Sequence, residues 1–477
     1  MSKGRKLAKN TAIISFGKIC TQIISYLLLP LYTAYLTTSE YGTVDLINTL
    51  VSLFVPIITF ELDQGIFRFL IDCRNDEKET SKLISTTIFF IITQSAILAI
   101  IYIFIVQFIT NEYKYYLLAY LIVNSLLGIL LNICRGIGDN KQYTIASFIN
   151  GILTVLLNVY LIAFIHLGAR GMLLANILGQ NIGIIYIFIA KKMYRYINIK
   201  NYDKNLIKKL LKFSFPLVPN ALSWWIVNIS DRLIISGILG ISQNGIYSIA
   251  NKFPNLISTF FGFFNLAWTE SAAENYKEKD KDIFYTNVFN KTIEIFGSAC
   301  ILIITLMPFV FNVLINEQYK EAYNQIPILM FGSLFNTLVI FLGSIYIANK
   351  KTKEIAKTTT IAAIINIVIH LLLINYIGLY AASVSTLIAW LSMFIYRYID
   401  AKKYVNIKMN YKIFISMILL MVISTITYYI NNNMINLIIL LITLVYAIAI
   451  NKNNIVLVKK IITDKVKKND VNSSIEN

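Results

Sequence analysis

The sequence predicts an all-α, polytopic membrane protein with about fourteen transmembrane helices. Of its 477 residues 57% are hydrophobic and only 14% are charged, whereas soluble proteins are about 45–50% apolar and about 25% charged. The apolar residues gather in runs of about 20, the length that crosses about 30 Å of hydrocarbon. Basic residues are concentrated in alternate loops, which is typical of a chain that crosses a bilayer repeatedly.

The expected spans follow one another with short loops and no long linker, so no separate soluble domain is expected. They begin near Thr11, Thr43, Leu83, Tyr115, Tyr143, Gly171, Phe213, Gly245, Asn287, Tyr323, Thr358, Leu379, Ile413 and Leu437.

The loop charges predict the orientation. If the N-terminus is cytoplasmic, the inward loops hold 35 of the 43 Lys and Arg residues, and the outward loops hold only Lys114, Arg170 and Lys320. This asymmetry follows the positive-inside rule and places both termini in the cytoplasm. The net charge of +18 is then explained by topology and anionic lipid headgroups, and nucleic acid is not an expected partner.

Internal similarity predicts two lobes. Ser39–Gly42 matches Ser242–Gly245 at an offset of 203 residues, and Gly168–Gly171 matches Gly378–Ala381 at an offset of 210. Because each repeat has an even number of spans, we expect parallel lobes of six helices around a central cavity. The expected parts are 1–192, a connector 193–212 on the inner membrane surface, 213–400, and two extra helices with a basic tail at 401–477.

Proline placement indicates where the spans bend. A proline inside a helix frees a backbone carbonyl and permits a kink. We therefore predict that Pro30, Pro56 and Pro254 are gating prolines. For Pro216 and Pro219 a kink and an ordinary position in the first helical turn are both open.

Ionisable residues inside the spans are the candidate site, because each costs about 2.5–3.5 kcal/mol to insert. Lys18 and Glu61 lie equally far from the turn between spans 1 and 2, and Asp231 and Lys252 lie about equally far from the turn at Ser242. These spacings predict two pairs, for which structural and substrate-binding roles are both open.

Two arginines extend this set of charges. Arg232 adds a positive charge that we expect to be uncompensated, and Arg68 is either part of the site or a snorkelling anchor. The sequence holds no Walker motif, and its cysteines and histidines show no metal spacing. We expect no enzyme and no cofactor; coupling to a Na⁺ or H⁺ gradient is left open.

Several short motifs, taken in order, resemble a known family. They are Leu27–Leu36, Thr38–Leu46, Asp231–Arg232, Gly245–Lys252 and Trp268–Glu270. They are similar to Wzx-type flippases of bacterial O-antigen, capsule and exopolysaccharide assembly, within the multidrug/oligosaccharidyl-lipid/polysaccharide exporter superfamily. The resemblance implies an alternating-access transporter in the bacterial plasma membrane. Its implied cargo is an undecaprenyl-diphosphate-linked oligosaccharide, moved from the inner to the outer leaflet.

With that cargo, Lys18, Arg232 and Lys252 are the expected diphosphate ligands. Membrane lipids are expected partners, and polysaccharide polymerase or assembly proteins are further candidates. Three alternatives are open. A drug/cation antiporter of the same superfamily would favour a carboxylate-rich cavity, and a lipid II flippase would differ only in cargo. A membrane polymerase or ligase would need a large external loop, which is not expected here.

Overall fold

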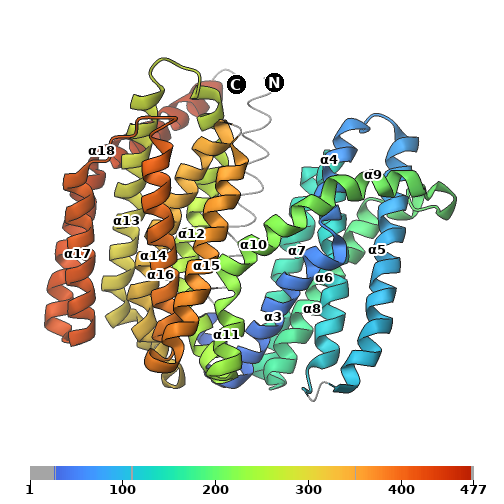
Figure 1. Ribbon diagram of the computed structural model, residues 1–477, viewed down its shortest axis with the longest axis horizontal. Coiled ribbons are helices and arrows are strands. Elements are labelled where there is room, and N and C mark those ends of the chain that lie inside the picture. The colour runs from blue at the N-terminus through green and yellow to red at the C-terminus, as the bar shows by residue number, and fades with distance from the viewer. Residues whose placement is uncertain (1–25, 27, 109–110, 350, 474–477) are drawn as a thin grey trace. The chain divides into compact units, whose positions relative to one another are not determined.

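The described residues of this computed structural model are 26, 28–108, 111–349 and 351–473, and their regular structure is entirely helical (Figure 1). This confirms the all-α prediction. The described chain forms two compact units. The first extends to Ser248 and includes Leu314–Tyr319; the second comprises Ile249–Val313 and continues from Lys320. The predicted lobes 1–192 and 213–400 stay a prediction.

The first unit holds the helices of the N-terminal half. They are α2 (Leu29–Tyr35), α3 (Thr38–Thr59), α4 (Leu62–Asp72), α5 (Glu77–Ile105), η1 (Val106–Phe108), α6 (Lys114–Gly136), α7 (Asn140–Asn158), η2 (Val159–Phe164), α8 (Gly168–Ala190), η3 (Met193–Arg195), η4 (Ile199–Asn201), α9 (Lys204–Ser214), η5 (Phe215–Leu217), α10 (Val218–Ile229), α11 (Asp231–Ile238) and the start of α12 (Ile241–Asn275), with η6 (Glu317–Tyr319).

The second unit holds the rest of α12 and the later helices. They are α13 (Lys281–Leu314), α14 (Glu321–Ala348), α15 (Thr352–Ile377), α16 (Tyr380–Ala401), α17 (Tyr411–Ile430) and α18 (Asn433–Ser473).

Eleven of the described helices are long and apolar enough to cross a membrane. They correspond to the second to sixth and the ninth to fourteenth predicted spans. The first predicted span begins outside the described residues. The eighth is α12, which is long enough but too polar to meet the same criteria.

The seventh predicted span is not one helix. It is divided at Ser230 into α10 and α11, each too short to cross alone. The Ser230 hydroxyl donates to the Ile226 carbonyl oxygen (2.6 Å). Such a bond back into the preceding turn competes with the helical pattern and bends helices. The span predicted to begin near Phe213 is therefore interrupted at Ser230.

The first unit has a continuous apolar core that explains the place of α9. Leu62, Ile66 and Leu70 of α4 are buried together with residues of α5 and α6, and Ile207 and Leu210 of α9 pack into the same cluster. The lysines of α9 lie on its opposite, exposed side. This amphipathic pattern holds α9 against α4 and α5 (Figure 1).

The second unit is built around α14. In the most apolar stretch of this helix, 78% of the residues are buried. Trp268 of α12 stacks on Phe341 of α14 with ring centroids 4.3 Å apart. Arg397 of α16 is only 3% exposed, although its place near the end of a predicted span is typical of a loop residue. Its guanidinium donates to Thr358 Oγ1 (2.8 Å) and to the Val339 carbonyl oxygen (3.0 Å). Arg397 therefore joins α16 to α15 and α14.

We expect Arg397→Lys to lower the free energy of unfolding by about 3 kcal/mol, because an ammonium cannot reproduce the forked donors and leaves buried acceptors unpaired. The measurement is the thermal unfolding midpoint of the purified chain in detergent. Lys403→Gln, which changes a side chain that is 70% exposed, is the control. Equal midpoints for the two variants would contradict this role.

Candidate functional site

The charged site lies where α3 meets α11. Arg232 Nε is 3.0 Å from Asp45 Oδ2, and the two side chains are 13% and 18% exposed. The Arg232 charge is thus paired, and the expectation that it is uncompensated is wrong. The pair forms because an isolated guanidinium inside the membrane costs more than one that faces a carboxylate.

The second repeat supplies two further donors to Asp45. Ser248 Oγ donates to Asp45 Oδ1 (2.6 Å), and Asn244 Nδ2 lies 3.3 Å from Asp45 Oδ2. Both carboxylate oxygens of Asp45 are therefore hydrogen-bonded. A charge satisfied in this way can be held away from water.

Asp231, the neighbour of Arg232, has a different environment. It is 4% exposed, and Tyr247 Oη donates to its Oδ2 (3.2 Å). Adjacent residues of α11 thus contact different groups, Asp231 on α12 and Arg232 on α3. The predicted pair between Asp231 and Lys252 joins residues of the two units and stays a prediction.

Two glycines allow the helices to approach closely beside this pair. A Cβ atom on Gly42 would collide with the Ile241 carbonyl oxygen, and one on Gly245 would collide with the Thr38 carbonyl oxygen. Thr38 Oγ1 and Ser242 Oγ are 2.7 Å apart in the same contact. Only glycine fits at both positions, because the obstacle is backbone that cannot rotate away.

The contact is reciprocal between the matched motifs. Thr38 and Ile241, Gly42 and Gly245, and Asp45 and Ser248 are each 203 residues apart, which is the offset of the predicted repeat. Equivalent residues of the two motifs therefore meet one another. We name this region, Thr38 to Asp45 together with Arg232 and the segment from Ile241 to Ser248, the repeat contact.

Comparisons with known proteins show the family of this chain. Residues 7–269 match the family model described as "Polysaccharide biosynthesis protein". The chain belongs to this family. It is also 25% identical over 324 residues to the uncharacterized membrane protein MJ1375 of Methanocaldococcus jannaschii, covering 61% of this chain and 75% of that protein. MJ1068 of the same organism is 22% identical over 434 residues, covering 83% of this chain and 84% of that protein.

The fold of this polysaccharide biosynthesis family member is similar to that of solved membrane transporters. The lipid II flippase MurJ in an inward closed conformation matches with a TM-score of 0.69 and 15% identity, covering 93% of this chain and 100% of that one. An inward-facing multidrug resistance MATE family transporter of the MOP superfamily matches with a TM-score of 0.66 and 12% identity, covering 80% and 95%. The chain is thus a multi-pass membrane protein with the fold that MurJ and this MATE family transporter share.

Two other predicted charges of this family member lie elsewhere in the first unit. Arg68 pairs with Asp72 at 2.7 Å, and the side chains are 51% and 67% exposed. Such an exposed pair contributes about 0–1 kcal/mol and resembles a surface anchor. Glu61 lies between α3 and α4, where Phe60 and Glu61 both have positive φ (50° and 55°). Its predicted partner Lys18 is outside the described residues.

The predicted gating prolines differ in position. Pro56 and Pro254 lie inside α3 and α12, whereas Pro30 lies in the first turn of α2. A proline in a first turn costs little, since that turn has no intrahelical partner for its N–H. Pro216 and Pro219 also lie in first turns. A gating role for Pro30, Pro56 and Pro254 stays a prediction.

Sequence reasoning missed Asp45, Asn244 and Ser248. Asp45 is an ionisable residue inside the second predicted span, three residues after Gly42, and Ser248 follows Gly245 by the same three residues. The repeat spacing was therefore the available signal. It relates the two residues but does not show that they touch.

Proposed function

We propose that this protein is a flippase that carries an undecaprenyl-diphosphate-linked oligosaccharide from the inner to the outer leaflet of the plasma membrane by alternating access. The proposal includes fourteen spans, both termini in the cytoplasm, and a role in surface polysaccharide assembly. The observation that carries it is the partly buried Asp45–Arg232 pair, in a chain of the polysaccharide biosynthesis family.

The chemistry of that pair suits a diphosphate cargo. A guanidinium binds phosphate oxygens through two parallel hydrogen bonds. In the structure the Arg232 guanidinium forms an ion pair with the Asp45 carboxylate. If α3 and α11 separate, the anionic headgroup can take the place of the carboxylate. The arginine is then never left unpaired inside the membrane, which lowers the barrier to the exchange.

Other predicted residues complete the proposed site. Lys18 and Lys252 are further diphosphate ligands, with Glu61 as the partner of Lys18 and Asp231 beside Arg232. Arg68 is not included, because it forms an exposed pair with Asp72. Coupling to a Na⁺ or H⁺ gradient is left open, and polymerase or assembly proteins would receive the cargo. Membrane lipids surround the tail of the cargo throughout.

Two alternative cargoes follow from the solved structures with a similar fold. MurJ is a lipid II flippase, and the MATE family transporter is a multidrug resistance protein, so lipid II and cationic drugs are the alternatives to test. Both likenesses fall at or below 15% identity, so they support the fold and leave the cargo to experiment.

Deleting the gene tests the proposal directly. We expect surface polysaccharide to disappear and the lipid-linked oligosaccharide to accumulate on the inner leaflet, as measured by enzymatic labelling of right-side-out and inverted vesicles. Unchanged surface glycan with new sensitivity to cationic drugs would give the antiporter. Arrested peptidoglycan synthesis with cell lysis would give the lipid II flippase.

The orientation is tested with thiol reagents. In a Cys20→Ser background, we expect an impermeant maleimide to label Cys73 in inverted vesicles and not in intact cells. Burial raises the pKa of the Cys73 thiol, so labelling should rise roughly tenfold per pH unit as the thiolate forms. The loop charges place Cys134 on the same cytosolic side, but its side chain is completely buried. It serves with Cys300 as an internal negative control, and labelling of Cys73 in intact cells would reverse the topology.

A further inference from the structure

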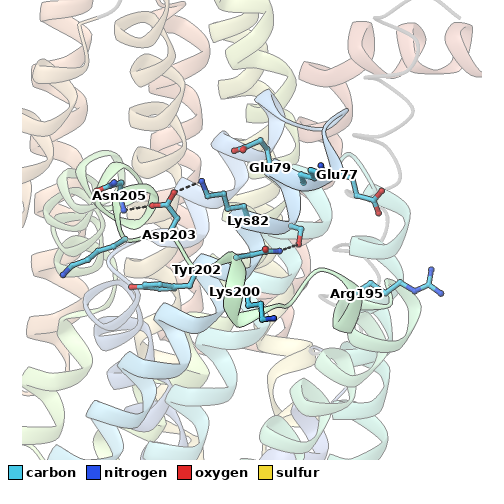
Figure 2. A pocket seen from close by; sticks show the side chains of 12 residues that line it. Glu77, Glu79, Lys82, Arg195, Lys200, Tyr202, Asp203 and Asn205 are labelled. Carbon is cyan, nitrogen blue, oxygen red and sulfur yellow. Dashed lines mark hydrogen bonds and ion pairs between the residues drawn. The ribbon is translucent and has the colours of Figure 1, made fainter.

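A polar cavity of about 730 Å³ lies between the start of α5 and the segment that leads into α9, both in the first unit (Figure 2). It does not include any residue of the repeat contact. Its lining residues are Glu77, Lys78, Glu79, Ser81, Lys82, Arg195, Lys200, Asn201, Tyr202, Asp203, Lys204 and Asn205.

The wall of this cavity is held by hydroxyl groups of α5. Ser81 Oγ and Ser85 Oγ both donate to the Tyr196 carbonyl oxygen (2.8 and 2.7 Å). Asn201 Nδ2 donates to Ser81 Oγ (2.9 Å), and the backbone N–H of Asp203 donates to Thr86 Oγ1 (3.1 Å). The segment is therefore docked on α5, and the cavity exists before any ligand arrives.

Only one of the five positively charged side chains that line the cavity forms an ion pair among the described residues. Lys82 Nζ is 2.6 Å from Asp203 Oδ2, and Figure 2 shows Lys82 reaching across to this carboxylate. The Lys82 ammonium and the N–H groups of Leu206 and Asn205 lower the pKa of Asp203 to about 2, so this pair stays ionised. Among the described residues, no ion pair engages the other four lining cations, Lys78, Arg195, Lys200 and Lys204.

Exposed apolar and aromatic side chains lie around the cavity. Ile199 and Tyr194 beside the cavity are 70% and 58% exposed, and Phe213 and Phe215 at the far end of α9 are 43% and 57% exposed. Aromatic and apolar side chains next to lysines are typical of surfaces that lie at the headgroup level of a bilayer. A ligand of this cavity would therefore have an anionic head and an apolar remainder.

We propose that this cavity binds the phosphate headgroup of an anionic phospholipid from the surrounding leaflet, as a bound lipid and not as transported cargo. Lys78, Lys200 and Lys204 supply the positive charge for the phosphate. Glu77 and Glu79, also in the lining, accept hydrogen bonds from headgroup hydroxyls, which favours a glycerol headgroup. This assignment does not depend on the identity of the cargo.

The test is the thermal unfolding midpoint of the full chain in neutral detergent, titrated with phosphatidylglycerol, phosphatidylcholine or inorganic phosphate. We expect a saturable rise with phosphatidylglycerol alone. The variant Lys78→Gln/Lys200→Gln/Lys204→Gln should bind this lipid at least about tenfold more weakly. If it does not fold, Lys200→Gln alone should weaken binding by a smaller factor.

The matched control removes the same charge from the same surface. Lys208→Gln/Lys209→Gln/Lys212→Gln changes three exposed lysines of α9 that do not line the cavity, and it should bind the lipid as the parent does. If both triple variants weaken binding equally, the attraction is diffuse surface charge and the site does not exist. If inorganic phosphate raises the midpoint as much as the lipid, the ligand is a soluble anion and the lipid assignment is overturned.

Discussion

Replacing Arg232 with glutamine is expected to abolish surface polysaccharide and to reduce the amount of protein in the membrane. The change leaves Asp45 charged and partly buried, with only Ser248 and Asn244 as partners. Removing one partner of a buried ion pair typically costs about 3–5 kcal/mol. The single variant therefore cannot by itself separate a loss of binding from a loss of folding.

The double variant Asp45→Asn/Arg232→Gln separates these two effects. It removes both charges, so no unpaired charge remains, and we expect abundance to return toward the parental level. If Arg232 binds the diphosphate, export per molecule should remain reduced by about 30-fold or more. The measurement is surface polysaccharide normalised to membrane protein by immunoblot. Parental export by the double variant would make the pair purely structural.

A lysine at position 232 refines the same test. Arg232→Lys retains the charge near Asp45 but offers a point charge in place of a planar fork. We expect abundance close to the parental value with only partial export. Full export by this variant would show that bidentate contact with phosphate is not needed.

A methyl group on Gly42 or Gly245 is expected to have the second largest effect. Each Cβ would meet a backbone carbonyl oxygen of the facing motif, Ile241 for Gly42 and Thr38 for Gly245. Overpacking of this kind costs about 1–3 kcal/mol. It acts only on states in which the repeat contact is closed, so we expect Gly42→Ala and Gly245→Ala to reach the membrane but to lose most export.

Two other glycines provide the controls. Gly128 in α6 and Gly237 in α11 have no atom within 4 Å of a built Cβ. Alanine there should leave export unchanged and stabilise its helix by up to about 1 kcal/mol. Export by Gly42→Ala at the level of Gly237→Ala would show that closing this contact is not part of the transport cycle.

The sequence predicted what depends on local pattern. Span length and hydropathy are properties of consecutive residues, and eleven predicted spans appear as helices. Partner choice depends on helix rotation and crossing, which hydropathy does not determine. For this reason the Asp45 partner of Arg232 was missed. The burial of Arg397 was also missed. A charged residue near the end of a predicted span is typical of a loop, and only its neighbours in the fold show that it is buried.

The repeat contact has the form of an isologous interface, in which residue i meets residue j and j meets i. A half-length chain carrying one Ser-x-x-Gly motif could make the same contact with a second copy of itself. Joining the copies in one chain frees the two sides to diverge. Asp45 faces Ser248, its equivalent at the offset of 203, and the arginine that neutralises Asp45 has Leu29 at its own equivalent position. One side of this contact thus supplies the anion and the other the cation, an asymmetry that a symmetric contact between two identical subunits cannot have.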